Sequence, residues 1–234
     1  MKRKIITTAD GSKTIQIEDW DEQYHSKHGA IQEAYHVFIK QGLFHFYNKQ
    51  CHLERSRKVS SESQQNVSIL EIGFGTGLNA FITMLEAEKL GVNVDYVGIE
   101  AYPVLMDEIE QLNYSSQLFV EPEVFKKLHK TSWEEQHGIS PNMKLTKRQL
   151  QFSEISDINT YNLIYFDAFG ARVQPELWTE SIFEIMYDAL KDKGVLVTYS
   201  AKGSVRRAMQ AVGFTVERLP GPPGKREMLR GMKH

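Results

Sequence analysis

The stretch Ile69-Leu70-Glu71-Ile72-Gly73-Phe74-Gly75-Thr76-Gly77-Leu78-Asn79 decides the fold. An apolar run enters three alternating glycines, and an amphipathic helical pattern follows. Glycines lack the Cβ atoms that keep a backbone away from a ligand, and a helix N-terminus offers free N–H groups and a positive dipole. The stretch predicts a strand, a nucleotide-side binding loop and a helix. A strand-to-helix turn also needs glycine when nothing binds, so this alternative stays open here.

The spacing of the glycines selects among ligands. A dinucleotide fingerprint would place its last glycine at position 78, which is Leu78, and no Gly-Lys-Ser/Thr follows for a P-loop. An acidic strand end followed by G-x-G-x-G instead resembles motif I of the S-adenosylmethionine (SAM) methyltransferases. The resemblance implies cofactor contacts from Glu71, Gly73, Phe74, Gly75, Gly77 and Asn79.

The composition is that of an ordinary soluble globular protein. Of the 234 residues, 41% are hydrophobic and 25% are charged, which excludes disordered and fibrous classes. The basic start lacks the apolar region of a signal peptide, and no run of about 18 apolar residues occurs, so we expect a cytoplasmic protein without a membrane span. The single cysteine excludes an internal disulfide and a cysteine-rich zinc site, and the eight histidines form no metal motif, so no metal is expected.

Charge is distributed unevenly along the chain. The net charge of −2 argues by itself against nucleic-acid binding, yet the part from Ser200 onward carries eight basic and only two acidic residues. A basic edge on an acidic body is typical of a protein that docks a polyanion there. A solvated helix face with a charged tail is an equally good explanation of the charge alone.

The pattern after a serine-rich stretch, residues 56–66, predicts an α/β fold. Residues 1–62 are interpreted as an N-terminal extension and linker, with a strand at 14–18 and a helix from Ala30, and residues 63–234 as the core. Strands and helices alternate in the core, which predicts a Rossmann-like, mostly parallel sheet with helices on both faces and a C-terminal antiparallel edge strand. The predicted strands are 67–72, 95–100, 145–149, 162–166, 194–200, 214–218 and the edge strand 226–232; helices are predicted at 76–90, from Pro103, after a Thr179 cap and after a Ser204 cap.

Two acidic residues follow predicted strands, and ligands in such sheets bind at strand ends. Glu100 follows the glycine loop at the sequence separation expected of a carboxylate that accepts the ribose hydroxyls of an adenosine. The competing role is a cap for a helix at Pro103. Asp167 directly follows an apolar strand and is the predicted catalytic residue. It would hold the N–H groups of an amine and aim its lone pair at a methyl donor, a role of orientation more than of a dedicated base. The competing role is again a cap.

Several linked motifs resemble the methyltransferase half of the bifunctional MnmC tRNA-modification proteins and their stand-alone relatives. They are Phe166-Asp167-Ala168-Phe169, Pro175-Glu176-Leu177-Trp178, Thr198-Tyr199-Ser200-Ala201, Val205-Arg206-Arg207-Ala208, Gly213-Phe214 and residues 221–228, together with motif I and Tyr24-His25-Ser26. The resemblance implies methyl transfer from SAM to the amine of 5-aminomethyl-2-thiouridine at the tRNA wobble position. It also implies cofactor contacts at Asp167, Ala168 and Phe169. Because an FAD-dependent oxidase domain does not follow in this sequence, we expect a separate enzyme to supply the aminomethyl group.

The substrate side is predicted from the same motifs. Lys225 and Arg226 lie in a Gly- and Pro-rich turn and are candidates for contacts with phosphate or with the modified base, while Phe169 and Trp178 are candidates for stacking on a flipped base. A plain tight turn and buried core aromatics are the competing explanations. Where many SAM enzymes carry an acid for adenine after the third strand, this chain has Arg148-Gln149-Leu150-Gln151, so adenine recognition must differ.

Three other functions remain open from the residues. A SAM-dependent N-methyltransferase could act on a small amine or a protein instead of tRNA. An aminopropyl transferase would share the fold, but it would need further carboxylates around a diamine channel, and the sequence after Asp167 offers none. A non-catalytic RNA-binding module would leave the glycine loop without a purpose.

Overall fold

The computed structural model describes residues 2–49 and 65–234, and these residues form one large and one small sheet. The large sheet has the order β10-β11-β9-β8-β4-β5-β7-β6. Its strands are β4 (Asn66–Ile72), β5 (Asn93–Ile99), β6 (Gln136–Ser140), β7 (Met143–Arg148), β8 (Tyr161–Phe166), β9 (Leu190–Thr198), β10 (Thr215–Pro220) and β11 (Glu227–Met232). Strands β7, β5, β4, β8 and β9 are parallel, which confirms the predicted Rossmann-like fold.

Strand β4 lies at the centre of the sheet, between β5 and β8. The chain leaves β4 toward β5 on one side and reaches β8 on the other only later, so strand order reverses here. At such a point the loops at the carboxyl ends diverge and leave a crevice. The topology therefore places the glycine loop, Glu100 and Asp167 around one opening.

The last strand differs from its predicted place. Residues 226–232 were expected to form an antiparallel edge strand, and β11 is indeed antiparallel to its neighbours. However, it lies between β9 and β10, so β10 forms the edge. The apolar run Met228-Leu229 explains the correction, because both residues are fully buried, as interior strands require. The opposite edge, β6, was not predicted, because its polar, short sequence carries little strand signal.

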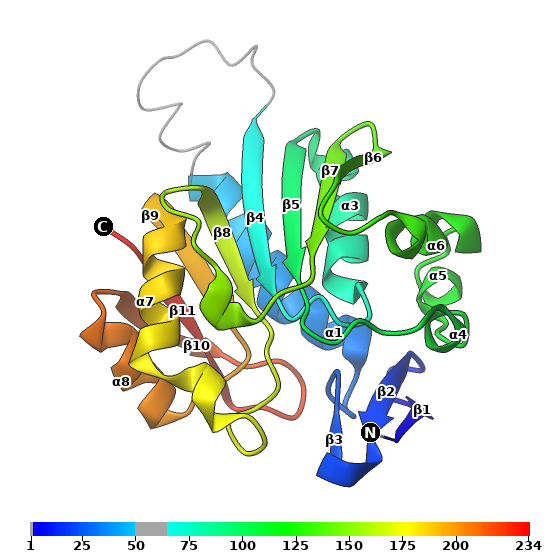
Figure 1. The fold of residues 1–234 in the computed structure, drawn as a ribbon, viewed down its shortest axis with the longest axis horizontal. Helices are drawn as coiled ribbons and strands as arrows, with labels where there is room; N and C mark the ends of the chain where they lie inside the picture. Colours follow the sequence, from blue (N-terminus) through cyan, green and yellow to red (C-terminus); the bar gives the residue numbers. More distant parts are fainter. Residues whose placement is uncertain (1, 50–64) are drawn as a thin grey trace.

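Helices cover both faces of the sheet (Figure 1). Alternating strand residues point to opposite faces: Leu163 and Tyr165 join the core with the N-terminal helices, and Ile164 and Phe166 join the core with the later ones. The first face is covered by α1 (Ala30–Ala34), a π-helical continuation (Tyr35–Phe44) and α3 (Leu78–Leu90), and the second by α7 (Glu180–Ala189) and α8 (Gly203–Ala211). The predicted extension thus contributes a helix to the main core.

Two predicted helix starts are wrong, and a third is confirmed in position but without a side-chain cap bond. No helix begins at Pro103; residues 100–105 form a loop, and the short helix α4 (Met106–Ile109) follows. Thr179 holds the N-cap position of α7, but its hydroxyl donates to the Glu176 carbonyl and not to a helix N–H. Ser204 lies inside α8, whose N-cap is Lys202. In each case the local signal was read correctly as a boundary, while the exact partner depended on the preceding loop.

A small antiparallel sheet precedes the core (dark blue in Figure 1). It consists of β1 (Arg3–Thr7), β2 (Lys13–Ile17) and the two-residue β3 (Glu22–Gln23), with a 3-10 turn (Glu18–Trp20) between the last two. Two short helices, α5 (Tyr114–Gln117) and α6 (Pro122–Lys130), complete the chain. Most of the predicted linker, and Cys51, lie outside the described residues, and the domain boundary at residue 62 stays a prediction. None of the helices in residues 2–49 and 65–234 is long and apolar enough to cross a membrane.

Candidate functional site

A cavity of about 870 Å³ opens at the carboxyl ends of β4, β5 and β8. This volume lies within the range of pockets that hold a cofactor-sized ligand. Its wall comes from the glycine loop, the loops after β5, β7 and β8, the small N-terminal sheet, α1 and the turn before β11. The structure thus brings together residues from both ends of the chain around the predicted strand-end carboxylates.

The glycine loop is held against the neighbouring strand ends. The N–H groups of Gly73 and Phe74 both donate to the carbonyl of Ile99, and Gly73, Gly75 and Gly77 all have positive φ. A Cβ on Gly73 would lie 2.7 Å from the backbone oxygen of Asp167, and one on Gly75 would lie 2.9 Å from the Tyr24 ring. The cradle exists only because these positions carry no side chain.

We expect Gly73→Ala to lose more stability than backbone strain alone would cost, and to bind SAM more weakly. Gly91 is a matched control: it also has positive φ, yet a Cβ there meets nothing within 4 Å. Gly91→Ala should cost about 1–2 kcal/mol of stability from the left-handed conformation alone. Gly73→Ala should cost more and should weaken SAM binding roughly tenfold or more, a change of about 1.4 kcal/mol. Thermal unfolding and titration calorimetry measure both; equal stability losses with unchanged SAM affinity would contradict the clash.

Not every predicted loop contact reaches the cavity. Gly73, Phe74, Gly75 and Asn79 line it, while Glu71 and Gly77 do not. Gly77 is the left-handed N-cap of α3 and packs against the rings of His129 and Phe74, so its role is steric. The Phe74 side chain is itself buried and stacks edge-on against Trp133, which leaves its backbone for a ligand.

Glu100 lies at the cavity and braces the glycine loop, and it does not cap a helix. Its carboxylate lines the cavity, and it accepts N–H bonds from Gly75 at 2.9 Å and from Tyr102 at 2.9 Å. It therefore ties the glycine loop to its own loop, and no helix is capped. Burial raises the pKa of Glu100, and the two backbone N–H groups oppose that rise. A carboxylate retains further lone pairs, so the ribose role remains open to it.

Asp167 and Glu71 are joined by one amide. Asn79 Nδ2 donates to Glu71 Oε1 at 2.9 Å and to Asp167 Oδ2 at 2.8 Å. Burial, followed by the negative charge of Glu33, raises the pKa of Asp167 to about 7, while the Asn79 bond and the Lys225 charge act in the opposite direction. Burial also raises the pKa of Glu71 well above its usual value. Glu71 thus fixes Asn79, and Asn79 fixes Asp167. Glu71 itself is fully buried and does not line the cavity, which argues against the predicted direct contact with the cofactor.

The raised pKa of Asp167 predicts a pH-dependent effect on stability. In the unfolded chain this carboxyl has its ordinary pKa of 3.8, whereas in the folded protein its pKa is about 7. The folded state therefore loses stability as pH rises between these values. Asp167→Asn removes the titrating group, so its gain in Tm over the wild type should be small near pH 4 and largest near about pH 8. Calorimetry of both proteins at the two pH values checks this. A Tm of Asp167→Asn below that of the wild type at the higher pH would contradict it.

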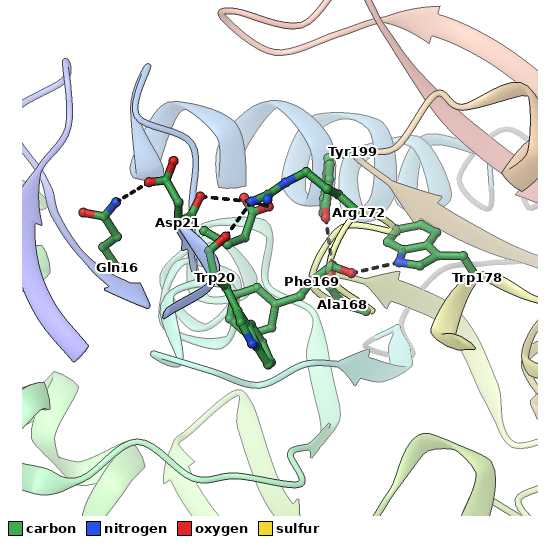
Figure 2. A network of polar contacts seen from close by, with 9 residues as sticks. Gln16, Trp20, Asp21, Ala168, Phe169, Arg172, Trp178 and Tyr199 are labelled. Carbon is green, nitrogen blue, oxygen red and sulfur yellow. Dashed lines mark hydrogen bonds and ion pairs between the residues drawn. The ribbon is translucent and has the colours of Figure 1, made fainter. Parts of the chain in front are cut away.

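An aromatic and ionic contact closes the cavity on the side of the small sheet (Figure 2). Phe169 packs edge-on against Trp20 and Tyr24, with ring centroids 5.6 and 5.0 Å apart. Arg172 donates to the carbonyls of Trp20 and Asp21 and to the carboxylate of Glu22. The loop after β8 and the N-terminal segment therefore form one wall.

Trp178 does not take the predicted stacking role. Its side chain is only 5% exposed, packs on Phe166, and donates from Nε1 to the carbonyl of Phe169 at 2.8 Å. On the other side, the Tyr199 hydroxyl donates to the Ala168 carbonyl at 2.8 Å. Figure 2 shows these two bonds fixing the backbone of residues 168 and 169. Trp178 thus supports the Asp167 loop from behind, while Ala168 and Phe169 line the cavity as predicted.

The turn before β11 brings Lys225 to the cavity and leaves Arg226 exposed outside the wall. Lys225 Nζ bonds Glu33 Oε1 at 2.6 Å and lies 3.7 Å from the centroid of the Tyr199 ring. Sequence reasoning missed Glu33, Tyr199, Trp20 and Arg172, because their only shared signal is position in the folded chain. It did name Tyr24 and Ser26, through resemblance.

The adenine side agrees with the unusual sequence after β7. Arg148 is held by Asp157 at 2.7 Å, and the cavity wall there is formed by Gln151, Phe152 and Ser153. This part of the wall thus offers an amide, a ring and a hydroxyl residue where a carboxylate is common. Within residues 2–49 and 65–234, no three histidine, cysteine or acidic residues gather in a way that would hold a metal ion.

Residues 121–234 match the model of a family described as S-adenosyl-L-methionine-dependent methyltransferase. This match covers just under half of the chain, and together with the sheet order and the glycine loop it supports a SAM-dependent methyltransferase.

The chain is similar in particular to bifunctional MnmC proteins, described as tRNA 5-methylaminomethyl-2-thiouridine biosynthesis proteins. It is 28% identical over 228 residues to that of Marinomonas sp. (strain MWYL1), covering 91% of this chain and 31% of the relative. For the protein of Leptospira interrogans (strain Fiocruz L1-130) the values are 29% over 228 residues, 92% and 33%. The predicted resemblance is confirmed, and the chain spans about a third of the length of these relatives.

Solved structures share the fold. MNMC2 from Aquifex aeolicus superposes with a TM-score of 0.75 at 24% identity, covering 98% of this chain and 69% of that one. A spermidine synthase in complex with the transition-state analogue AdoDATO gives a TM-score of 0.51 at 14% identity, covering 95% of this chain and 70% of that one.

Proposed function

We propose that this chain transfers a methyl group from SAM to the amine of 5-aminomethyl-2-thiouridine at the tRNA wobble position, giving 5-methylaminomethyl-2-thiouridine. The observation that carries the proposal is Asp167: a cavity-lining carboxylate with a raised pKa, fixed by Asn79 beside the glycine cradle. The similarity to the MnmC proteins supports the choice of acceptor.

The cavity fits SAM on its own geometry. The Cβ-free cradle of Gly73 and Gly75 leaves room for the amino-acid and ribose part, and the Glu100 carboxylate stands ready for the ribose hydroxyls. Gln151, Phe152 and Ser153 line the remaining wall for the adenine. Bound SAM supplies an electrophilic methyl group on a sulfonium.

Asp167 positions the acceptor. Its ionised carboxylate accepts N–H bonds from the amine and so aims the nitrogen lone pair along the line of attack. A carbon–nitrogen bond forms as the carbon–sulfur bond breaks; the neutral amine becomes a methylammonium, and its surplus proton passes to Asp167 or to water. A carboxyl with a pKa of about 7 is suited to that exchange near neutral pH.

Further proposals follow for the partners. Lys202 and Lys225 line the cavity. The exposed Arg226 follows Lys225, and the exposed Arg207 lies on α8, whose N-cap is Lys202; this set of cations suits an RNA backbone. Phe169 lies where a flipped base could stack. A tRNA substrate is in keeping with a cytoplasmic location, and an earlier reaction must place the aminomethyl group on the tRNA before this methylation.

The direct test uses labelled SAM and tRNA that carries 5-aminomethyl-2-thiouridine. We expect label at the wobble nucleoside, lost from the macromolecular fraction after RNase treatment, and none on tRNA that lacks the aminomethyl group. Label that survives RNase on protein or on a metabolite would favour the alternative of a small amine or a protein as acceptor. Mass spectrometry of wobble nucleosides from cells without this protein should show the unmethylated amine.

An aminopropyl transferase needs free carboxylates around a diamine. Although the sequence near Asp167 suggested none, the fold brings Glu22 and Glu33 to the cavity. However, Glu22 is bonded to Arg172, so of these two carboxylates only Glu33, which Lys225 pairs, remains for exchange of its cation, whereas a diamine brings two ammonium groups. Decarboxylated SAM with putrescine should therefore yield no spermidine.

A further inference from the structure

Glu33 is a nearly buried carboxylate that faces the cavity without a place in the mechanism above. It lies on α1, is 6% exposed and lines the cavity. Its Oε2 accepts the N–H of Ser26 at 2.8 Å, and its Oε1 accepts Lys225 Nζ at 2.6 Å. The first bond fixes the direction of the carboxylate, and the second fills its only cationic contact among the described ion pairs.

The surroundings of Lys225 Nζ form a cation site. The ammonium is bonded to a carboxylate on one side, and the face of the Tyr199 ring lies 3.7 Å away on another. A carboxylate and an aromatic face are two groups that stabilise an alkylammonium most strongly. The site is therefore built for the group –CH₂–NH₃⁺, of which the end of a lysine side chain is one example.

The same site adjoins Asp167. The negative charge of Glu33 raises the pKa of Asp167, and the positive charge of Lys225 lowers it, so all three groups act on one another across the cavity. The Tyr199 hydroxyl bonds the carbonyl of Ala168, the residue after Asp167. A cation held between Glu33 and Tyr199 therefore lies on the Asp167 side of the cavity. The ammonium gives one proton to the ionised Asp167 carboxylate before it reacts, so the nitrogen that attacks the methyl group is neutral.

We propose that Glu33 and the Tyr199 ring bind the ammonium of the incoming methyl acceptor, and that Lys225 occupies this place until the acceptor arrives. The proposal rests on the proposed function, since it requires an alkylamine acceptor. A buried carboxylate left without a partner is costly, so the site needs a resident cation when empty. Exchange of one ammonium for another keeps Glu33 paired throughout, and it releases Lys225 on its turn at the mouth of the cavity.

The proposed exchange predicts opposite effects of two substitutions on the binding of an alkylammonium. A purely structural ion pair between Glu33 and Lys225 would predict similar effects of both. Glu33→Gln removes the site, whereas Lys225→Met removes the resident cation and keeps the aliphatic stem. Glu86→Gln is the control, because Glu86 is also nearly buried and is bonded to Lys89 at 2.7 Å, away from the cavity. SAM affinity and Tm are measured for all variants.

The binding experiment uses propylammonium and the protein loaded with S-adenosylhomocysteine, followed by calorimetry. We expect Glu33→Gln to weaken propylammonium binding roughly tenfold or more, Lys225→Met to strengthen it roughly threefold to tenfold, and Glu86→Gln to leave it unchanged. With the nucleoside 5-aminomethyl-2-thiouridine as acceptor, the KM for the nucleoside should rise in Glu33→Gln, fall in Lys225→Met and stay unchanged in Glu86→Gln.

Unchanged binding in Glu33→Gln, or unchanged or weaker binding in Lys225→Met, would overturn the proposal. Because propylammonium binding needs no methyl transfer, it tests the cation site even if the tRNA assay fails. The converse result is that the tRNA is methylated normally while the KM for the acceptor is the same in the wild type and in Glu33→Gln. That result would overturn this inference alone and leave the proposed function standing.

Discussion

Asp167→Asn is expected to lower kcat/KM for methyl transfer by roughly 10²- to 10⁴-fold, the usual range for a positioned proton acceptor. The amide retains the size of the side chain and its neighbour Asn79, which bonds Asp167 Oδ2 at 2.8 Å. It cannot offer two acceptor oxygens to the amine or take up its proton. SAM affinity should change little, because the glycine cradle and Glu100 are untouched. Single-turnover methylation and calorimetry with SAM measure the two effects separately.

The control for this variant is Asp188→Asn, since Asp188 is an exposed aspartate on α7. It should behave as the wild type in both assays. The wild-type rate should also rise with pH through about 7, as Asp167 ionises, and this acid limb should vanish in the asparagine variant. Full activity in Asp167→Asn would exclude the residue from the chemistry.

Glu100→Gln should weaken SAM binding by roughly 10- to 150-fold, which corresponds to the loss of about 1.5–3 kcal/mol for a hydrogen bond to a charged acceptor. The effect has two sources, the ribose hydroxyls and the Gly75 N–H, which Glu100 Oε2 accepts at 2.9 Å. Loss of the second contact would loosen the glycine cradle as well. The maximal rate at saturating SAM should fall far less than in Asp167→Asn.

An analogue of S-adenosylhomocysteine without the ribose hydroxyls separates these sources. If Glu100 binds the ribose, the penalty of Glu100→Gln should be smaller for the analogue than for S-adenosylhomocysteine, and the part that remains measures the Gly75 contact. Glu110→Gln, at the exposed C-cap of the helix that follows, is the matched control. A full Glu100→Gln penalty with the analogue would assign the residue to loop support alone.

The parts of the site that follow strands directly were predictable from sequence. Parallel strands end at one edge of the sheet, so Glu100 and Asp167 could be placed together from their positions after β5 and β8. The glycines at 73 and 75 were predictable for a similar reason, because a cradle must lack Cβ atoms. The motif resemblance supplied the cofactor class, which the family match confirms.

Residues that meet only through tertiary packing were not predictable. Glu33 and Lys225 stand on segments that no local pattern connects, and the Arg172 bonds to Trp20 and Asp21 depend on how the small sheet docks. Trp178 was misassigned because an aromatic after a proline gives no sign of which face it buries. Glu71 was assigned to the cofactor because a strand-end acid looks the same whether it contacts a ligand or its neighbour Asn79.

The insertion of β11 between β9 and β10 has a consequence for protein synthesis. While residues up to about 220 have emerged from the ribosome, β9 has its parallel neighbour β8 on one side and nothing on the other, and β10 has no partner in the sheet. Unpaired edges of apolar strands are templates for aggregation. Only when residues 227–232 emerge can one strand satisfy both neighbours. The nascent chain should therefore be most in need of chaperones after β9 and β10 have emerged and before the turn that also delivers Lys225 to the cavity.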